Sequence, residues 1–547
     1  MRPRGWVAAV VFALSLARCA VYLDRARIAE GHLDPVGKIA PQDEALYAHT
    51  SLHMAREGDW LTPRFMGRYA LYKPPLLYWL SALSVKLAGA SAVALRLPCL
   101  LAAAAASALV FAWLWRMRSL AAAVTGWLLL LMNPLWHVLA RVALTDMLLA
   151  AASVGALWCL GRDPRLARHG PFVGFGVLLG LAILAKAVAG LFPLLVVLGF
   201  TLLMKGPEKP SWKRLAQACA VAATVALPWH LYQLALHPRW FLAEYVGVEI
   251  LQFTLGAPPQ TSAENHVLFY VRRLVLTDPI LCCAALAAVP ALLKACRGRS
   301  AAAPMLMLSW LGVGVTVALF NQYRNFAYLL VLIPALCLAA GGYGPLAGRR
   351  ARWAVPVALL AAFGLKAAIP GRPWSLPFLP ASKIPTARVL ENYCEKARAA
   401  ELLIVWQDDE FYATLLPLHR VRYVLWGEHP NHRPAPLDFR QLGIMVTTDE
   451  FLDLDRWRPV FRQRLKAWSL DSDEPLATVV TFRSPEEVAR LVRAHPQSDF
   501  LLPGQILPRL DGVETTHQVI RVSAARVLLL SRAVADRSRH RPASCRL

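Results

Sequence analysis

The chain has 547 residues, of which 57% are apolar and only 17% charged, and its formal net charge is +24. Soluble domains rarely combine such values, and the apolar residues gather in blocks long enough to cross about 30 Å of hydrocarbon. The positive charge lies largely in short clusters between these blocks, which is typical of cytoplasmic loops and argues against a nucleic-acid partner. We therefore expect a protein embedded in membrane lipids.

The first apolar window follows Arg2 and Arg4 and resembles a secretory signal. No small-residue cleavage pattern follows it, and many further windows do, so we interpret it as a retained first helix, with a cleaved signal as the alternative. About eleven helices are expected from the hydropathy pattern. Their windows are residues 6–23, 92–114, 119–139, 145–160, 172–185, 188–204, 215–235, 267–293, 303–320, 326–342 and 353–369.

The basic clusters give these helices an orientation. With the N-terminus inside, the clusters fall on the cytoplasmic side, where Lys and Arg near span ends are retained. The loop 24–91, the turn 141–146 and the loop 236–266 then lie outside, and most acidic residues of the first 370 lie in these external segments. The positions of the basic clusters and of the acidic residues therefore predict the same topology.

The composition changes after residue 370. Short β-branched runs at 402–406, 421–425, 442–447, 477–482 and 519–522 are accompanied by a helix-like segment at 485–494, which predicts a small α/β domain. An odd number of spans places it outside the membrane. Cys394 and Cys545 are its two cysteines, and a disulfide between them stays open. Asp408, Asp409 and Glu410 are interpreted as a solvated loop, because no histidine stands at ligand spacing.

The external loop 24–91 holds the candidate chemistry. Asp43 and Glu44 open a helix-like segment, where an acid can act simply as a cap that complements the helix dipole. Lys73 precedes Pro74 and Pro75, and proline is favourable in the first turn of a helix. A carboxylate pair and a lysine in one external loop place charged groups at the edge of the bilayer.

The order and spacing of several motifs then resemble a known family. The motifs are Asp43-Glu44, Gly58-Asp59-Trp60-Leu61-Thr62-Pro63, Lys73-Pro74-Pro75-Leu76-Leu77-Tyr78-Trp79, Arg96-Leu97-Pro98, Leu144-Thr145-Asp146-Met147 and Ala185-Lys186-Ala187-Val188-Ala189-Gly190-Leu191. Together they resemble the first part of membrane glycosyltransferases that use polyprenyl-phosphate sugars, namely the protein O-mannosyltransferase and aminoarabinose–lipid A transferase families.

This resemblance implies a fold and a location. Residues 1–370 are expected to form an all-α, polytopic membrane domain with a glycosyltransferase C-type fold and a large first external loop at 24–91. Residues 371–547 are expected to form the external (periplasmic) α/β domain. The implied location is the bacterial cytoplasmic (inner) membrane.

The resemblance also implies roles for six residues. Asp43 matches the catalytic base, which removes a proton from a weak nucleophile, and Lys73 matches the phosphate-binding lysine. Arg324 is a further candidate for the donor phosphate, with a snorkelling side chain at the membrane interface as the alternative. Lys186 is a candidate to balance a lipid phosphate or, equally, to anchor the end of a helix. Asp146 and Glu44 are candidates for a second acid, which would bind a divalent cation of unknown identity or hold Lys73. The alternative is a purely structural ion pair of Lys73 with Asp146 or Glu44.

The chain departs from the family pattern at two positions. Leu46 stands where members often have arginine, and Tyr72 stands where many have glutamate before Lys-Pro-Pro. In the loop 236–266, Glu249 and Gln252 resemble a Glu-His-x-Gln-Arg stretch, but its histidine and arginine are absent, which weakens a direct role. These departures put a lipid A acceptor and an aminoarabinose donor in doubt.

The sequence thus predicts an inverting glycosyltransferase. It would move a sugar from a polyprenyl-phosphate donor to a lipid, glycan or protein acceptor on the outer face of the membrane. One alternative is a lipid-linked sugar transporter or flippase, whose polar residues would line a path within the spans. The other is a catalytically inactive envelope scaffold, which the substitutions at Leu46 and Tyr72 would permit.

Overall fold

The computed structural model divides the chain into two compact units. The first comprises Met1–Leu23, Tyr72–Ser81 and Arg96–Leu376, and the second Asp24–Leu71, Ala82–Leu95 and Pro377–Leu547. The structure describes residues 5–20, 23, 43–65, 68–255, 266–298, 301–320, 325–344, 353–368, 402–406, 422–426, 479–482, 485–521 and 526–533.

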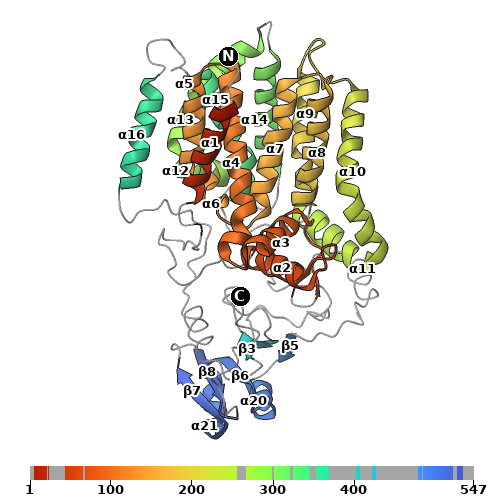
Figure 1. The fold of residues 1–547 in the computed structure, drawn as a ribbon, viewed down its shortest axis with the longest axis vertical. Coiled ribbons are helices and arrows are strands. Elements are labelled where there is room, and N and C mark those ends of the chain that lie inside the picture. The colour runs from red at the N-terminus through yellow and green to blue at the C-terminus, as the bar shows by residue number, and fades with distance from the viewer. Residues whose placement is uncertain are drawn as a thin grey trace. The chain divides into compact units, whose positions relative to one another are not determined.

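The first unit is a bundle of helices (Figure 1). Its helices are α1 (Gly5–Ala20), α4 (Ala92–Met117, whose first turn belongs to the second unit), α5 (Leu120–Met132), α6 (Pro134–Leu139), α7 (Thr145–Arg162), α8 (His169–Lys186), η1 (Ala187–Leu191), α9 (Phe192–Leu203), α10 (Trp212–Leu236), α11 (Pro238–Trp240), η2 (Phe241–Leu255), α12 (His266–Thr277), α13 (Pro279–Cys296), α14 (Ala302–Phe320), η3 (Phe326–Val331), α15 (Ile333–Tyr343) and α16 (Ala354–Ala368). All eleven apolar windows fall on helical segments in their described residues. Six described segments are long and apolar enough to cross a membrane, so the expected count of eleven spans stays a prediction.

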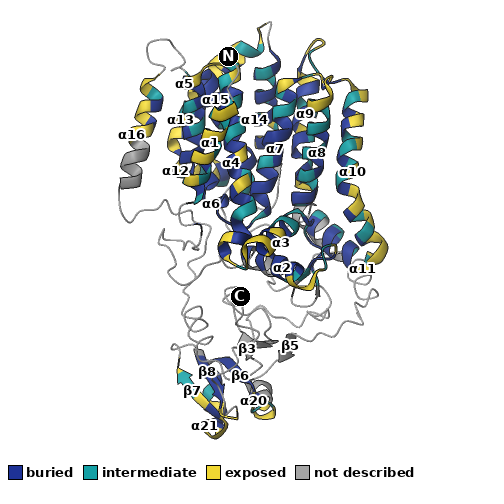
Figure 2. Cartoon of the chain, viewed as in Figure 1, coloured by how far each residue is buried: buried dark blue, intermediate teal, exposed yellow. Residues whose placement is uncertain are grey.

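The outer surface of the bundle is apolar. Leu202, Leu286 and Val357 expose 73%, 70% and 60% of their surface, and Figure 2 shows exposed positions along α10 and α16. Large exposed apolar faces are a liability in water. They match a hydrocarbon solvent, in which only structures with internally satisfied backbones, such as helices, are stable.

Glycines allow α8 and α10 to pack closely. A Cβ on Gly176 would lie 2.8 Å from the carbonyl oxygen of Ala218, and one on Gly180 would lie 2.7 Å from that of Ala222. The spacing of four residues puts both glycines on one face of α8, as in the small-residue interfaces of membrane helices. The two backbones approach each other to a distance that only glycine permits.

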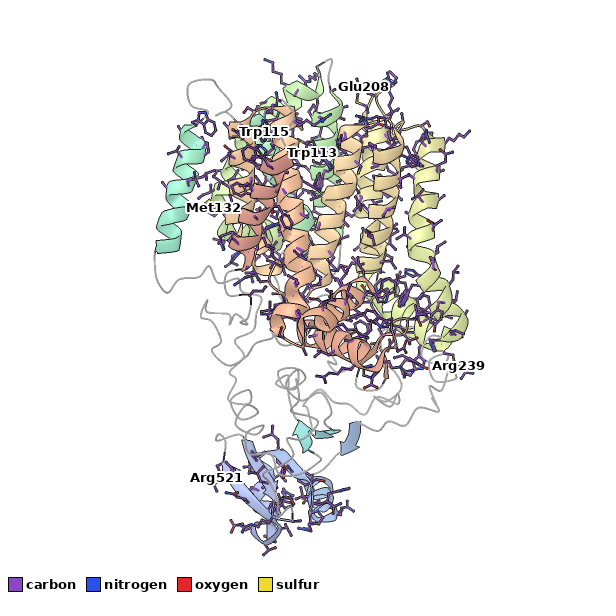
Figure 3. The ribbon with its side chains drawn as sticks, in the orientation of Figure 1. Trp113, Trp115, Met132, Glu208, Arg239 and Arg521 are labelled. Atoms are coloured by element: carbon purple, nitrogen blue, oxygen red, sulfur yellow. The ribbon has the colours of Figure 1, made fainter. Side chains whose placement is uncertain are left out.

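A cluster of tryptophans packs α4, α7 and α14 against one another. Trp113 of α4 (Figure 3) is buried and lies edge-on to Trp158 of α7, with 5.7 Å between ring centroids. Its other neighbour is Trp310 of α14, at 6.2 Å, whose Nε1–H donates to the carbonyl of Val331 at 2.9 Å. The buried polar atom of Trp310 is therefore satisfied while its aromatic surface packs against Trp113.

Two of the expected helices are each interrupted at one residue, and a hydrogen bond connects the two interruptions. The side chain of Asn133, between α5 and α6, accepts from the N–H of Trp136 at 3.0 Å, while its Nδ2 donates to Oδ2 of Asp278 at 2.9 Å. Asp278 stands between α12 and α13, and its Oδ1 accepts from the N–H of Leu281 at 3.0 Å. Each residue caps the helix that follows it, and proline occupies the first position of both helices.

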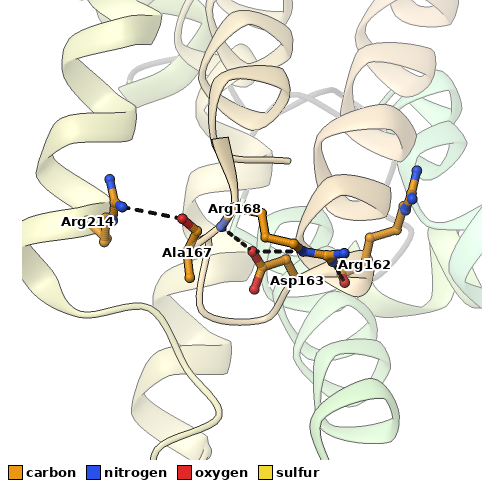
Figure 4. Close-up of polar contacts among 5 residues, drawn as sticks. All are labelled: Arg162, Asp163, Ala167, Arg168 and Arg214. Atoms are coloured by element: carbon orange, nitrogen blue, oxygen red, sulfur yellow. Dashed lines mark hydrogen bonds and ion pairs between the residues drawn. The ribbon is translucent and has the colours of Figure 1, made fainter. Parts of the chain in front are cut away.

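An arginine-rich turn marks one end of the bundle (Figure 4). Asp163 accepts from the backbone N–H of Arg168 at 2.7 Å, and the guanidinium of Arg168 also donates to the carbonyl of Arg162. Arg214, in the first turn of α10, donates to the carbonyl of Ala167 at 3.4 Å. The end of α7 and the starts of α8 and α10 therefore lie together at a basic end, as the predicted topology requires of a cytoplasmic surface.

The second unit contains α2 (Asp43–Glu57), β1 (Arg64–Phe65), β2 (Arg68–Tyr69) and the last part of α3 (Leu76–Ala88), a helix shared with the first unit. The helix α2 ends at Gly58, whose φ of 80° is accessible to glycine without strain. Asp59 then accepts from the N–H of Thr62 at 3.0 Å, and β1 pairs with β2 in antiparallel register. The helix at Asp43 agrees with the sequence pattern, whereas the β1–β2 hairpin was not predicted.

The C-terminal part of the second unit contains a six-stranded mixed sheet of order β5-β4-β3-β6-β8-β7. Its strands are β3 (Leu402–Trp406), β4 (Arg422–Trp426), β5 (Val479–Phe482), β6 (Asp499–Pro503), β7 (His517–Arg521) and β8 (Arg526–Ser531), accompanied by α20 (Pro485–Ala494), η7 (Gly504–Arg509) and α21 (Val513–Thr516). Phe500, Leu529 and Val492 are buried together in its core. The expected run 442–447, the acids 408–410 and the cysteines 394 and 545 lie outside the described residues.

Candidate active site

Lys73 lies in the loop before α3 and forms an ion pair with Glu249 of η2. The two prolines that follow it, Pro74 and Pro75, lead directly into α3, which begins at Leu76. The side chains of Lys73 and Glu249 are only 12% and 9% exposed. A lysine and a glutamate this far removed from water need each other, because burying either charge alone is costly.

A second ion pair joins the ends of α7 and α8. The Nζ of Lys186 lies 2.5 Å from Oδ1 of Asp146, and the side chains are 11% and 12% exposed. Asp146 is in the first turn of α7 and Lys186 is the last residue of α8, so each charge complements the dipole of its own helix. Lys186 also lies 4.9 Å from the ring centroid of Tyr328, within reach of a cation–π contact.

Both ion pairs lie at the end of the bundle opposite the arginine-rich turn. The helices α7 and α8 have 18 residues each, which corresponds to about 27 Å. Asp146 and Lys186 are at one end of this pair of helices, and Arg162 and Arg168 are at the other. The helix α10 begins at the arginine-rich end, and η2 follows the opposite end of α10. Glu249 of η2 and its partner Lys73 therefore lie at the same end of the bundle as Asp146 and Lys186.

The pairing corrects one expectation. The structural alternative joined Lys73 to Asp146 or Glu44, and Asp146 was a candidate either to bind a divalent cation or to hold Lys73. In the structure, Lys73 instead forms an ion pair with Glu249, and Asp146 forms one with Lys186. The reason is geometric: Asp146 is fixed at the start of α7, where the end of its antiparallel neighbour α8 supplies a nearer cation.

An apolar groove of about 480 Å³ lies between α8, α9, α10 and η2. Its lining is aliphatic apart from a few residues, among them His230 and Tyr245, whose Nε2 and hydroxyl lie 2.6 Å apart. Nδ1 of His230 faces the carbonyl of Ala226 at 2.8 Å, so in the neutral ring Nδ1 carries the proton and Nε2 accepts from the tyrosine. Burial, together with the charge of Glu249, raises the pKa of Tyr245, which keeps its hydroxyl protonated.

The remaining candidate residues are Asp43, Glu44 and Arg324. Asp43 is the first residue of α2, but its side chain is not among those described, and Arg324 lies outside the described residues. Glu44 is buried, with 1% of its surface exposed, in the second unit. Tyr72, one of the two departures from the family pattern, is also buried. The expected roles of Asp43, Glu44 and Arg324 stay predictions.

The described residues do not fit a divalent cation at Asp146. No group of three or more His, Cys, Asp or Glu side chains with metal-ligand geometry occurs in the part of the chain that the structure describes. The carboxylate of Asp146 is already held by the ammonium of Lys186. We therefore derive no metal-dependent step.

Glu249 is the site residue that sequence reasoning undervalued. It was considered only as part of an incomplete Glu-His-x-Gln-Arg stretch, and its role was judged weak for that reason. The signal that could have found it is local: a single carboxylate within the apolar run Val246-Gly247-Val248-Glu249-Ile250-Leu251. A charge in such a run is costly to desolvate and tends to be paired or functional.

Comparisons with known proteins bear on this geometry. Residues 72–232, which include both lysines, match the family model described as dolichyl-phosphate-mannose-protein mannosyltransferase. The resemblance drawn from the sequence is confirmed. The undecaprenyl phosphate-alpha-4-amino-4-deoxy-L-arabinose arabinosyl transferase of Aeromonas salmonicida is 30% identical over 207 residues, covering 36% of this chain and 36% of the relative. The protein of the same name from Yersinia pestis is 27% identical, covering 55% of this chain and 54% of the relative.

The matched segments thus span about a third to a half of the length of these relatives. The fold extends further. ArnT from Cupriavidus metallidurans, solved bound to undecaprenyl phosphate, has a TM-score of 0.64 at 19% identity and covers 98% of this chain and 99% of its own. The archaeal oligosaccharyltransferase AglB from Archaeoglobus fulgidus, solved with an inhibitory peptide and a dolichol-phosphate, has a TM-score of 0.50 at 14% identity, covering 76% of this chain and 64% of its own.

Proposed function

We propose that this chain is an inverting glycosyltransferase that moves a sugar from a polyprenyl-phosphate carrier to a lipid, glycan or protein acceptor at the outer face of the bacterial cytoplasmic membrane. The observation that carries the proposal is the placement of two nearly buried ammonium groups, those of Lys73 and Lys186, at the end of a membrane bundle opposite its arginine-rich turn. A phosphate at the edge of the bilayer needs such cations.

Each part of the donor has a counterpart in the first unit. The apolar groove beside α10 suits an isoprenoid chain, and the lysines suit the phosphate that departs with it. The similarity to arabinosyl transferases named for an undecaprenyl phosphate sugar supports the same donor class. Preorganised cations that stabilise a leaving phosphate lower the barrier of group transfer.

The chemistry assigned to the two lysines follows from their positions, and that assigned to Asp43 follows from the sequence resemblance. Lys73 binds the phosphate before and after transfer, and Lys186 adds positive charge at the same end of the bundle. Asp146 positions Lys186 and does not touch the substrate. Asp43, at the start of α2, takes the proton from the acceptor. The external location of residues 371–547 and the eleven spans belong to the same proposal.

The experiment is reconstitution of the full chain in vesicles with a polyprenyl-phosphate sugar. Transfer releases the free polyprenyl phosphate, which mass spectrometry detects, and Asp43→Asn is the negative control. A labelled donor that crosses the vesicle membrane without losing its sugar would instead indicate a transporter. Mass spectrometry of envelope glycans in wild-type and deletion strains would name both sugar and acceptor.

A further inference from the structure

The ion pair between Lys73 and Glu249 sets a carboxylate where the donor's phosphate must bind. Both side chains are about nine-tenths buried, so water screens their charges poorly. A phosphate that approaches the Lys73 ammonium therefore meets the negative charge of Glu249 as well. The carboxylate and the phosphate cannot both form a close ion pair with one ammonium group.

The helix η2, which carries Glu249, is held at its start by contacts with α10. Phe241 and Tyr245 stack at 4.8 Å, and both lie against Trp229 and His230 of α10. Tyr245 is also hydrogen-bonded to His230. Glu249 comes four residues later, so its side chain can leave Lys73 while the start of η2 stays in place.

The geometry of η2 is itself unusual. Residues Phe241–Leu255 are π-helical, a conformation that is rare and often occurs at functional sites. This segment carries Glu249 towards Lys73 and Tyr245 towards the apolar groove. It therefore contacts both the cation proposed for the phosphate and the groove proposed for the lipid chain.

We infer that Glu249 competes with the polyprenyl phosphate for Lys73. In the absence of lipid it holds the lysine in place and neutralises its charge. Donor phosphate displaces it, and its return to Lys73 after transfer helps to expel the product. Glu249 is a positioning residue in this scheme, and the inference rests on the proposed function, which supplies the phosphate.

The test measures binding, apart from transfer. The full-length protein in nanodiscs is titrated with a fluorescent polyprenyl phosphate for wild type, Glu249→Gln, Lys73→Gln and the double variant. Glu249→Gln keeps the size of the side chain but removes the competing charge, so we expect at least about fivefold tighter binding, the lower end of coupling between sites. In the Lys73→Gln background the same change should have no effect, because the contested cation is absent.

Glu244→Gln is the matched control, since Glu244 is a buried glutamate on the same helix that forms no ion pair with Lys73 among the described contacts. Its affinity should equal that of the wild type. Turnover adds a second readout: Glu249→Gln should lower both KM and kcat, because the product leaves more slowly.

Unchanged or weaker binding by Glu249→Gln would overturn the inference, and so would equal tightening in the Lys73→Gln background or in Glu244→Gln. If Glu249→Gln does not fold, Glu249→Asp replaces it, with tighter binding expected from its shorter reach and unchanged binding counting against the inference. A wild-type protein that binds no polyprenyl phosphate would overturn both this inference and the proposed function. Binding and transfer without an effect of Glu249 would remove the inference alone.

Discussion

The ammonium of Lys186 lies 2.5 Å from the carboxylate of Asp146, across the adjoining ends of α8 and α7. The helix α8 can end there because Ala187 adopts a positive φ of 48°, after which η1 turns back so closely that a Cβ on Gly190 would meet the backbone of Ile183 at 2.3 Å. The position of Lys186 is therefore fixed by backbone geometry, and its ammonium is paired with Asp146.

Asp146→Asn should destabilise the protein by about 3–5 kcal/mol, the usual effect of leaving one member of a buried pair without its partner. The double variant Asp146→Asn with Lys186→Met should recover most of this loss, since no uncompensated charge remains. Thermal unfolding in detergent measures both. Equal stability of the single variant and the wild type would show that water reaches the pair.

Asp43→Asn should keep insertion and binding of the polyprenyl phosphate but lose about two to four decades of turnover, the scale expected for removal of a general base. Single-turnover transfer in vesicles measures the rate, and lipid titration checks binding. Near-normal transfer by a correctly inserted variant would leave Asp43 as a helix cap.

Lys73→Ala should weaken binding of the polyprenyl phosphate and lower turnover together, because its charge meets the phosphate in both the ground state and the transition state. Lys86→Ala provides the comparison: Lys86 is an exposed lysine of α3 that contacts the ring of Trp60. The same lipid titration should show no change for this variant. An equal loss in both variants would point to a general effect of charge.

Gly180→Ala should cost about 1–3 kcal/mol, the range for overpacking a tight contact, because its Cβ would meet the carbonyl oxygen of Ala222 at 2.7 Å. The obstacle is backbone, so α8 and α10 must separate. Gly170→Ala on the same helix has open space around the new Cβ and should be neutral. Thermal unfolding of the two variants, measured side by side, tests the helix contact.

His517 should make the stability of the C-terminal sheet depend on pH. Burial lowers the pKa of His517 in spite of the opposing influence of Ser498 and Asp499. A group whose folded pKa lies below its unfolded value of about 6.5 contributes its full stability above that value and loses it as the pH falls through the folded pKa. Pulse proteolysis in urea at pH 7.5 and pH 5 should therefore show a lower midpoint in acid, and His517→Gln should reduce the difference.

Hydropathy predicted the long helices of the bundle but not their breaks, and its windows did not include α3, α11 or η2. Averaging over a window hides a single residue, so the breaks at Asn133 and Asp278 were missed, although each is followed by proline and caps the next helix. In the C-terminal region, β6 and β8 were not predicted, because β6 has no β-branched residue and β8 has only Val527, and strand prediction depends on such residues.

The ion pairs could not be predicted from the sequence in the same way. Periodicity fixes which face of a helix is apolar, but it does not determine which distant helix end arrives beside it. Lys73 and Lys186 were both selected as candidates, and the structure decided their partners, Glu249 and Asp146. The partner of Lys73 lies on a π-helical segment, and no sequence pattern predicted this unusual geometry.

The hydrogen bond between Asn133 and Asp278 has a consequence for how this chain can change in length. One extra residue in α5 would turn Asn133 by about 100° around its helix and move it away from Asp278, which would break the hydrogen bond between these two buried side chains. In the segment between α9 and α10 no neighbour packs against Gly206, since a Cβ there would meet nothing within 4 Å, although its φ of 98° favours glycine at that one position. Insertions and deletions among descendants of this sequence should therefore accumulate in such turns and spare α5 and α12.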